Sequence, residues 1–83
     1  MKTAALRIII RQKLQDGRLP YDGMPRFWGG LADGEMCDAC DALIGKEQLV
    51  MEGIASTFSN KKAIQLHVRC FHIWDHERRV PMA

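Results

Sequence analysis

The feature that most constrains this chain is a set of three cysteines and one histidine, arranged as two close pairs. Cys37 and Cys40 form a Cys-x2-Cys pair, and His67 and Cys70 form a His-x2-Cys pair after residues 41–66. Every cysteine of the sequence belongs to one of these pairs. Two such pairs, separated by enough chain for a small hairpin, are what a tetrahedral zinc site requires. We therefore predict that these four side chains bind one zinc ion.

The spacing within each pair explains how four ligands reach one ion. A turn lets both thiolates of Cys-x2-Cys converge, and positions i and i+3 of a helix share a face, so His67 and Cys70 can meet in a first helical turn. Three thiolates and a neutral imidazole fill all four tetrahedral positions. We therefore expect a structural rather than a catalytic metal. Iron is the alternative that a sulfur-rich tetrahedral site leaves open.

Because the chain is short, we expect the bound metal to contribute a large share of its stability. Eighty-three residues allow a single domain, 1–83, whose hydrophobic core alone is marginal. A bound zinc adds on the order of 10 kcal/mol to such a fold. No apolar run approaches the ~20 residues that span a bilayer, and no signal peptide is expected. Because three cysteines cannot all pair as disulfides, we expect a reducing, cytoplasmic setting.

The N-terminal part, 1–16, is expected to be a helix that covers 4–15. Thr3 is the predicted N-cap, and Gly17 stands where a glycine often ends a helix. The apolar stripe of this helix consists of Leu6, Ile10 and Leu14, with Ile9 alongside. The solvated basic surface is expected to carry Arg7, Arg11 and Lys13.

The remaining chain is expected to form a wrapping loop, 17–36, and a zinc-finger-like module, 37–79. The loop is rich in glycine and is expected to bury its aromatic residues over the core, although Trp28-Gly29-Gly30 could instead form an exposed recognition loop. Within the module, alternation of apolar residues predicts two strands, 47–54 and 63–67. We expect a loop, 55–62, between these strands and a final helix over 68–79. The fold class is therefore α+β, with a short antiparallel hairpin between two helices.

Charge is distributed unevenly along the chain, although the formal net charge is only +2. Residues 31–60 are acidic, whereas both ends are basic. A protein whose main partner is nucleic acid is usually more uniformly basic than this.

The module resembles the poly(ADP-ribose) polymerase-type zinc finger. The resemblance covers 36–79 and rests on three stretches: Cys37-x2-Cys40-x2-Leu43-Ile44-x-Lys46, Leu49-x-Met51 and His67-x2-Cys70-Phe71-x2-Trp74. The order of knuckle, hairpin and ligand-bearing helix is similar to that of treble-clef zinc domains. The whole chain also resembles a set of small bacterial proteins without assigned function, through KLQDGRLP, Trp-Gly-Gly and the two ligand pairs.

These resemblances imply a treble-clef-like domain whose zinc ligands are Cys37, Cys40, His67 and Cys70. The family to which the finger belongs detects DNA breaks, with an apolar loop on exposed bases and basic residues on phosphates. The residues available here for nucleic-acid or other partner contacts are Arg7, Arg11, Phe58, Lys61, Lys62 and Arg69. Because acidic residues surround the ligands, we favour a protein partner over nucleic acid.

Three functions therefore remain open. The favoured one is a non-enzymatic zinc module that binds a macromolecule, and its nearest alternative is a DNA-binding zinc finger. The third is thiol redox chemistry at Cys37 and Cys40, although the glycine-rich loop before this pair is unlike the strand that precedes a thioredoxin motif. No catalytic arrangement stands out, and Asp75-His76-Glu77 is a helical run with no evident partner.

Overall fold

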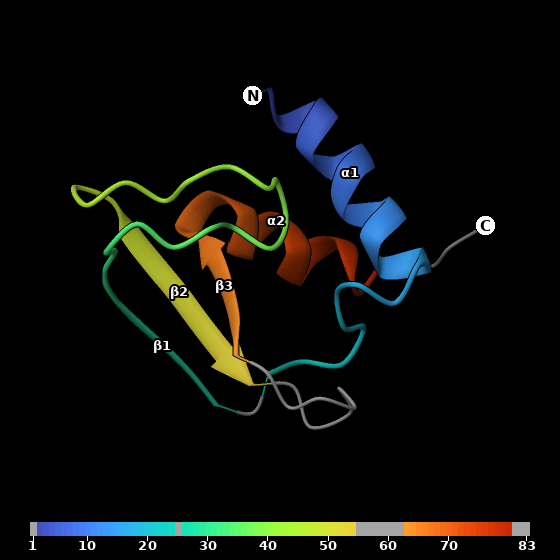
Figure 1. Cartoon of the computed structure of the whole chain (residues 1–83). Helices are drawn as coiled ribbons and strands as arrows, with labels where there is room; N and C mark the ends of the chain where they lie inside the picture. The colour runs from blue at the N-terminus through green and yellow to red at the C-terminus, as the bar shows by residue number, and fades with distance from the viewer. Residues whose placement is uncertain (1, 25, 55–62, 81–83) are drawn as a thin grey trace.

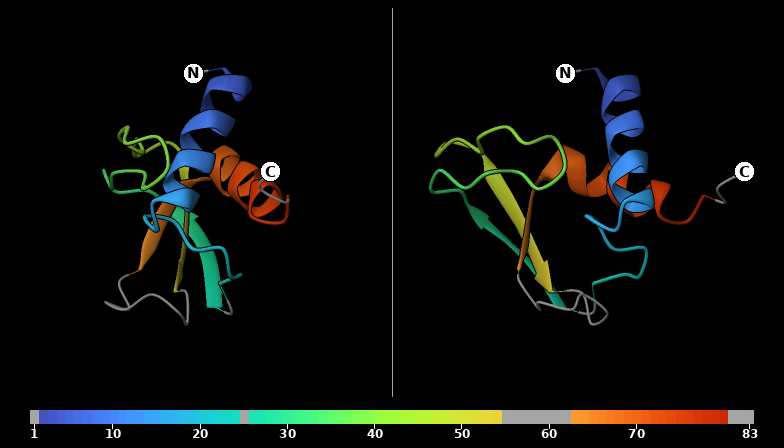
Figure 2. Two further views of the ribbon diagram at one scale, coloured as in Figure 1. Left: turned by 90° about the vertical axis from the view of Figure 1, so that its right-hand side faces the viewer. Right: turned by 45° about the vertical axis from the view of Figure 1, so that its right-hand side comes forward.

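The fold is a small sheet with two helices on one side of it. The computed structural model describes residues 2–24, 26–54 and 63–80. Its elements are, in order, α1 (Thr3–Gln15), β1 (Arg26–Leu31), β2 (Leu49–Ile54), β3 (Ile64–His67) and α2 (Val68–Glu77) (Figure 1). The strands form one antiparallel sheet in the order β1-β2-β3. Helix α2 contacts β2, β3 and α1, so it lies between the sheet and α1 (Figure 2). The predicted α+β class is confirmed.

Helix α1 buries the predicted stripe: Leu6, Ile10 and Leu14 are each at most 3% exposed. Its C-terminal end also agrees with the prediction. Gly17 adopts φ +77°, and the N–H groups of Gly17 and Arg18 bond to the carbonyls of Leu14 and Lys13. This is a Schellman ending, in which the left-handed position favours glycine.

The predicted N-cap of α1 is wrong. Lys2 occupies the cap position, and Thr3 is the first helical residue. The Thr3 hydroxyl is used elsewhere, because its Oγ1 accepts a hydrogen bond from Arg69 Nη2 at 2.7 Å. This contact joins the beginning of α1 to the beginning of α2.

The predicted wrapping loop, 17–36, contains a strand that the sequence did not indicate. Strand β1 pairs with β2 from Arg26 opposite Ile54 to Leu31 opposite Leu49. The expected burial of the aromatic residues is also wrong, since every residue of β1 is exposed. The apolar residues that this segment adds to the core are Leu19, Met24 and Ala32, whereas its exposed large apolar side chains are Tyr21, Phe27, Trp28, Leu31 and Met36.

The predicted hairpin is confirmed as β2 and β3, which pair from Val50 opposite His67 to Gly53 opposite Ile64. Its connection, 55–62, lies outside the described residues. Helix α2 ends at Glu77, slightly earlier than predicted. Its Trp74 is 1% exposed, and the indole Nε1 donates a hydrogen bond to the Pro20 carbonyl at 2.9 Å. The core thus joins α2 to the segment that follows α1.

A buried carboxylate fastens α1 to α2. Glu77 is fully buried, and its carboxylate oxygens lie 3.0 Å from Arg11 Nη1 and 3.3 Å from Arg7 Nε. The solvated basic face predicted for α1 is therefore wrong in part, because both guanidinium groups also pair with α2. The expectation that Glu77 lacks a partner is likewise wrong: this one acid pairs with two bases near the start of the sequence.

Candidate metal centre

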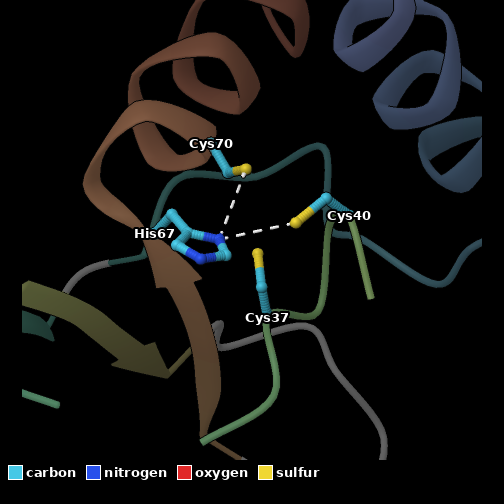
Figure 3. Close-up of side chains that lie close together, drawn as sticks. All are labelled: Cys37, Cys40, His67 and Cys70. Carbon is cyan, nitrogen blue, oxygen red and sulfur yellow. Dashed lines mark hydrogen bonds between the residues drawn. The ribbon is translucent and has the colours of Figure 1, made fainter. Parts of the chain in front are cut away.

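The first ligand pair lies on a tight turn between β1 and β2, residues 36–43, which we call the knuckle. Met36 and Leu43 form an isolated antiparallel bridge, and the Cys37 N–H bonds to the Ala42 carbonyl at 2.9 Å. Asp41 follows Cys40 with φ 64°, a left-handed conformation that aspartate tolerates better than most residues. The turn aims both thiols of the pair toward the beginning of α2 (Figure 3).

The second ligand pair stands where β3 becomes α2. His67 ends β3 and occupies the N-cap position of α2, and Cys70 lies in the first turn of this helix. The knuckle is attached directly to the same strand. The Asp38 N–H bonds to the Gln65 carbonyl at 2.8 Å, and the Gln65 N–H bonds to Asp38 Oδ2 at 2.7 Å. These two bonds hold the ligand pairs at a fixed separation.

The four predicted ligands converge as a single group. One donor atom from each of Cys37, Cys40, His67 and Cys70 lies within 4.8 Å of the other three. His67 Nδ1 is 3.4 Å from Cys40 Sγ and 3.9 Å from Cys70 Sγ, as Figure 3 shows. Around a tetrahedral zinc with ordinary bond lengths, an S···N separation of about 3.6 Å is required. The donor set and its spacing therefore fit one tetrahedral ion.

The tautomer of His67 also suits metal binding. Its Nε2 lies 3.2 Å from the Leu43 carbonyl oxygen, which can only accept a hydrogen bond, so Nε2 carries the proton. The lone pair is then on Nδ1, the nitrogen that faces the thiols. Metal-bound histidines are commonly oriented in this way by a carbonyl on their other nitrogen.

The three thiols influence one another strongly in the absence of a cation. A hydrogen bond donated by the Cys70 thiol lowers the pKa of Cys37 to about 4, against the opposing effect of burial. The same bond, together with burial, raises the pKa of Cys70, and burial raises the pKa of Cys40. The group thus favours one thiolate and two protonated thiols. A bound zinc would supply the positive charge that keeps all three deprotonated.

Lys13 supports the knuckle from α1, so its predicted place on the polar surface is wrong. Its side chain is 5% exposed, and its Nζ donates to the Asp38 carbonyl at 2.9 Å and to Asp41 Oδ1 at 2.7 Å. The sequence did indicate that Lys13 is buried. Residue 13 follows the buried Ile10 by three positions, and residues three apart share one face of a helix. A lysine on an apolar stripe is buried only when its amine has partners.

Three of the residues predicted for nucleic-acid contacts lie in the described part of the chain, and each of them has a partner on the other helix. Arg7 and Arg11 pair with Glu77, and Arg69 donates to Thr3, so all three connect the two helices. The other three residues of that prediction lie outside the described ranges, namely Phe58, Lys61 and Lys62.

A cavity of about 530 Å³ borders the metal centre between α1, the knuckle and the beginning of α2. Three of the ligands line it: Cys40, His67 and Cys70. The remaining lining residues that the structure describes are apolar or amide side chains and Arg69, with no carboxylate among them.

The chain was compared with protein-family models, with curated proteins and with solved structures, and none of the three comparisons finds a match. The resemblance to the poly(ADP-ribose) polymerase-type finger and to small bacterial proteins therefore stays a prediction. Within the described residues, neither helix is long and apolar enough to cross a membrane.

Proposed function

We propose that the protein is a non-enzymatic zinc module of the treble-clef type that binds another protein. Zinc, rather than iron, fixes the fold through its four ligands, and strand β1 provides the binding surface. We define the β1 surface as Phe27, Trp28 and Leu31, which are 55%, 47% and 75% exposed. The observation that carries the proposal is the exposure of these large apolar side chains along an edge strand, with Phe27 and Leu31 on one face of the sheet and Trp28 on the other. Exposed apolar side chains on an unpaired edge strand are typical of interaction sites.

A structural role for the metal is supported by its complete ligand set. Four protein ligands leave no position for a water molecule or a substrate. The adjoining cavity offers no carboxylate to act on a substrate there. Both features favour a binding module over an enzyme.

The redox alternative is less favourable on the same grounds. Cys37 and Cys40 lie in a bridged knuckle and face Cys70 and His67, so all three thiols belong to one group. A thioredoxin-like pair would instead open a helix after a buried strand. A metal-bound thiolate is also a poor nucleophile for disulfide exchange while its ion is present.

The DNA-binding alternative is less favourable because basic residues of α1 are paired with acidic side chains. Arg7 and Arg11 share the buried Glu77, whose single negative charge offsets part of the positive charge that would attract a phosphate. Lys13 is occupied by Asp41. Phosphate contacts supply most of the affinity of nucleic-acid binding, so engaged arginines weaken this interpretation.

Capture of partners from a cell extract tests the proposal. Zinc-loaded wild-type protein is compared with a Trp28→Ser/Leu31→Ser variant and with an Ile8→Ser control, since Ile8 is an equally exposed apolar residue on α1. We expect a protein that survives nuclease treatment and high salt to be retained by wild type and control but lost from the variant. Retention of nucleic acid that falls steeply with salt would instead favour the DNA-binding alternative.

A further inference from the structure

The two edge strands of the sheet differ in whether residues outside the sheet form hydrogen bonds with their backbone. On the β3 edge, Gln65 exchanges hydrogen bonds with Asp38 of the knuckle, so that edge is covered. On the β1 edge, no described residue outside β2 forms a backbone hydrogen bond with the strand. Figure 1 shows β1 at the outer side of the sheet, away from both helices. An open edge beside exposed apolar side chains can accept a further strand.

The direction of the free backbone groups follows from one hydrogen bond. The Ala32 N–H donates to the Gln48 carbonyl at 2.9 Å, so the backbone of Ala32 points toward β2. Because this direction alternates along a strand, the N–H and C=O groups of Phe27, Gly29 and Leu31 point to the open edge. An incoming strand must therefore pair with these three residues.

We propose that the strand which occupies this edge is β1 of a second copy, paired antiparallel about a two-fold axis at Gly29. This inference rests on the proposed function and names the partner of the β1 surface. The axis places Phe27 opposite Leu31 of the other copy, with their free backbone groups facing each other. Pairing joins the two sheets into one continuous sheet and removes both open edges.

The side chains of β1 are complementary to themselves in this register. Trp28 falls opposite Gly30 of the other copy, and a Cβ built on Gly30 meets no atom within 4 Å, so space is available for the indole. An aromatic side chain that covers a cross-strand glycine is a known stabilising device. On the opposite face, Phe27 meets Leu31, which extends the contact that Phe27 already makes with Phe71 at a centroid distance of 5.4 Å.

Charge also favours a second copy. Each β1 begins at the basic Arg26 and leads into a turn that carries Asp33 and Glu35. In an antiparallel pair, the basic start of one strand lies beside the acidic turn of the other. Such complementarity selects this orientation over a parallel one.

Sedimentation equilibrium of the zinc-loaded protein, from about 1 to about 500 µM, tests the inference, since small interfaces dissociate in this range. We expect the average mass to rise from 9.5 kDa toward twice that value. Tryptophan emission should shift to shorter wavelength in parallel. Trp28 becomes covered on pairing, whereas Trp74 is buried already and contributes a constant signal.

The decisive variant is Gly30→Val, because a Cβ at position 30 meets no atom of the monomer within 4 Å, whereas the valine side chain fills the space that Trp28 of the other copy needs. We expect it to weaken the dimer at least tenfold, with unchanged zinc content and circular dichroism. Leu31→Lys provides a second disruption, and Ile8→Lys is the control that should leave the dimer intact. A wild type that stays monomeric, a Gly30→Val dimer as tight as wild type, or a dimer lost in Ile8→Lys would each overturn the inference.

Failure of this inference is distinguishable from failure of the proposed function. A monomeric wild type that still captures another protein through Trp28 and Leu31 would overturn only the second copy as partner. A chain that folds without zinc would overturn the structural-metal proposal whatever its association state.

Discussion

Lys13 on α1 contacts Asp41 in the knuckle, with 2.7 Å between Nζ and Oδ1. The same amine donates to the Asp38 carbonyl at 2.9 Å, so one side chain holds two points of the turn that carries Cys37 and Cys40. Helix α1 contributes no metal ligand of its own. Through Lys13 it nevertheless orients the ligands, in the way that outer hydrogen bonds support metal sites elsewhere.

Replacement of Lys13 by Met should reduce stability by about 1–2 kcal/mol, because it removes two hydrogen bonds from a nearly buried amine. Helix propensity is almost unchanged by this substitution. Urea unfolding at one fixed free zinc concentration measures the effect. Lys46→Met, at an exposed lysine, is the matched control and should change little. A double-mutant cycle with Asp41→Asn should show coupling, and strict additivity would contradict the assigned contact.

Replacement of Glu77 by Gln should lower the free energy of unfolding by about 2 kcal/mol. The carboxylate is fully buried and faces Arg11 and Arg7, whose side chains are 29% and 54% exposed and can partly regain water. The control is Asp75→Asn, which alters an acid that pairs with Arg78 and Arg79 at the surface of the same helix and should cost under about 1 kcal/mol. Equal decreases in the free energy of unfolding of the two variants would show that burial of the Glu77 ion pairs adds nothing to stability.

Replacement of Gly53 by Ala should destabilise the sheet by about 1–3 kcal/mol. A Cβ at Gly53 would meet the Met24 sulfur and, at 3.1 Å, the Arg26 carbonyl oxygen. The Met24 side chain can move, but the carbonyl belongs to the β1–β2 ladder. Gly30→Ala is the control, because a Cβ there meets nothing within 4 Å. Thermal unfolding of both variants at low concentration checks this, and an unchanged midpoint for Gly53→Ala would refute the close packing.

Replacement of His67 by Gln should weaken zinc binding about a hundredfold or more, because one of four ligands and its Leu43 hydrogen bond are lost together. Competition with a chelator of known affinity measures the change. His72→Gln is the matched control, since His72 is exposed on the same helix and is not in the ligand group. A similar affinity for the two variants would remove His67 from the site.

The clustering of Cys37, Cys40, His67 and Cys70 could be predicted from the sequence because the geometry within each pair is local. The spacing within each pair limits which side chains can face one point, and α2 had a clear apolar face in Cys70 and Trp74. The same is true of α1, where Gly17 supplied the left-handed ending.

Strand β1 could not be predicted in this way, because its pairing with β2 is distant in sequence and none of its side chains is buried. Without a buried face there is no alternation to detect, and Gly29-Gly30 is typical of a turn. The partners of Lys13 and Glu77 were missed for a related reason. A helical pattern indicates which face is buried, but it does not identify a charged residue that crosses to another element.

Native mass spectrometry before and after chelation, with circular dichroism of both samples, tests the central claim most directly. The account predicts one zinc ion per chain, with loss of the ion and loss of folded structure occurring together. A chain that contains no metal and remains folded would contradict it. Cys37, Cys40 and Cys70 would then be free thiols, and the stability of the fold would have to come from its apolar core alone.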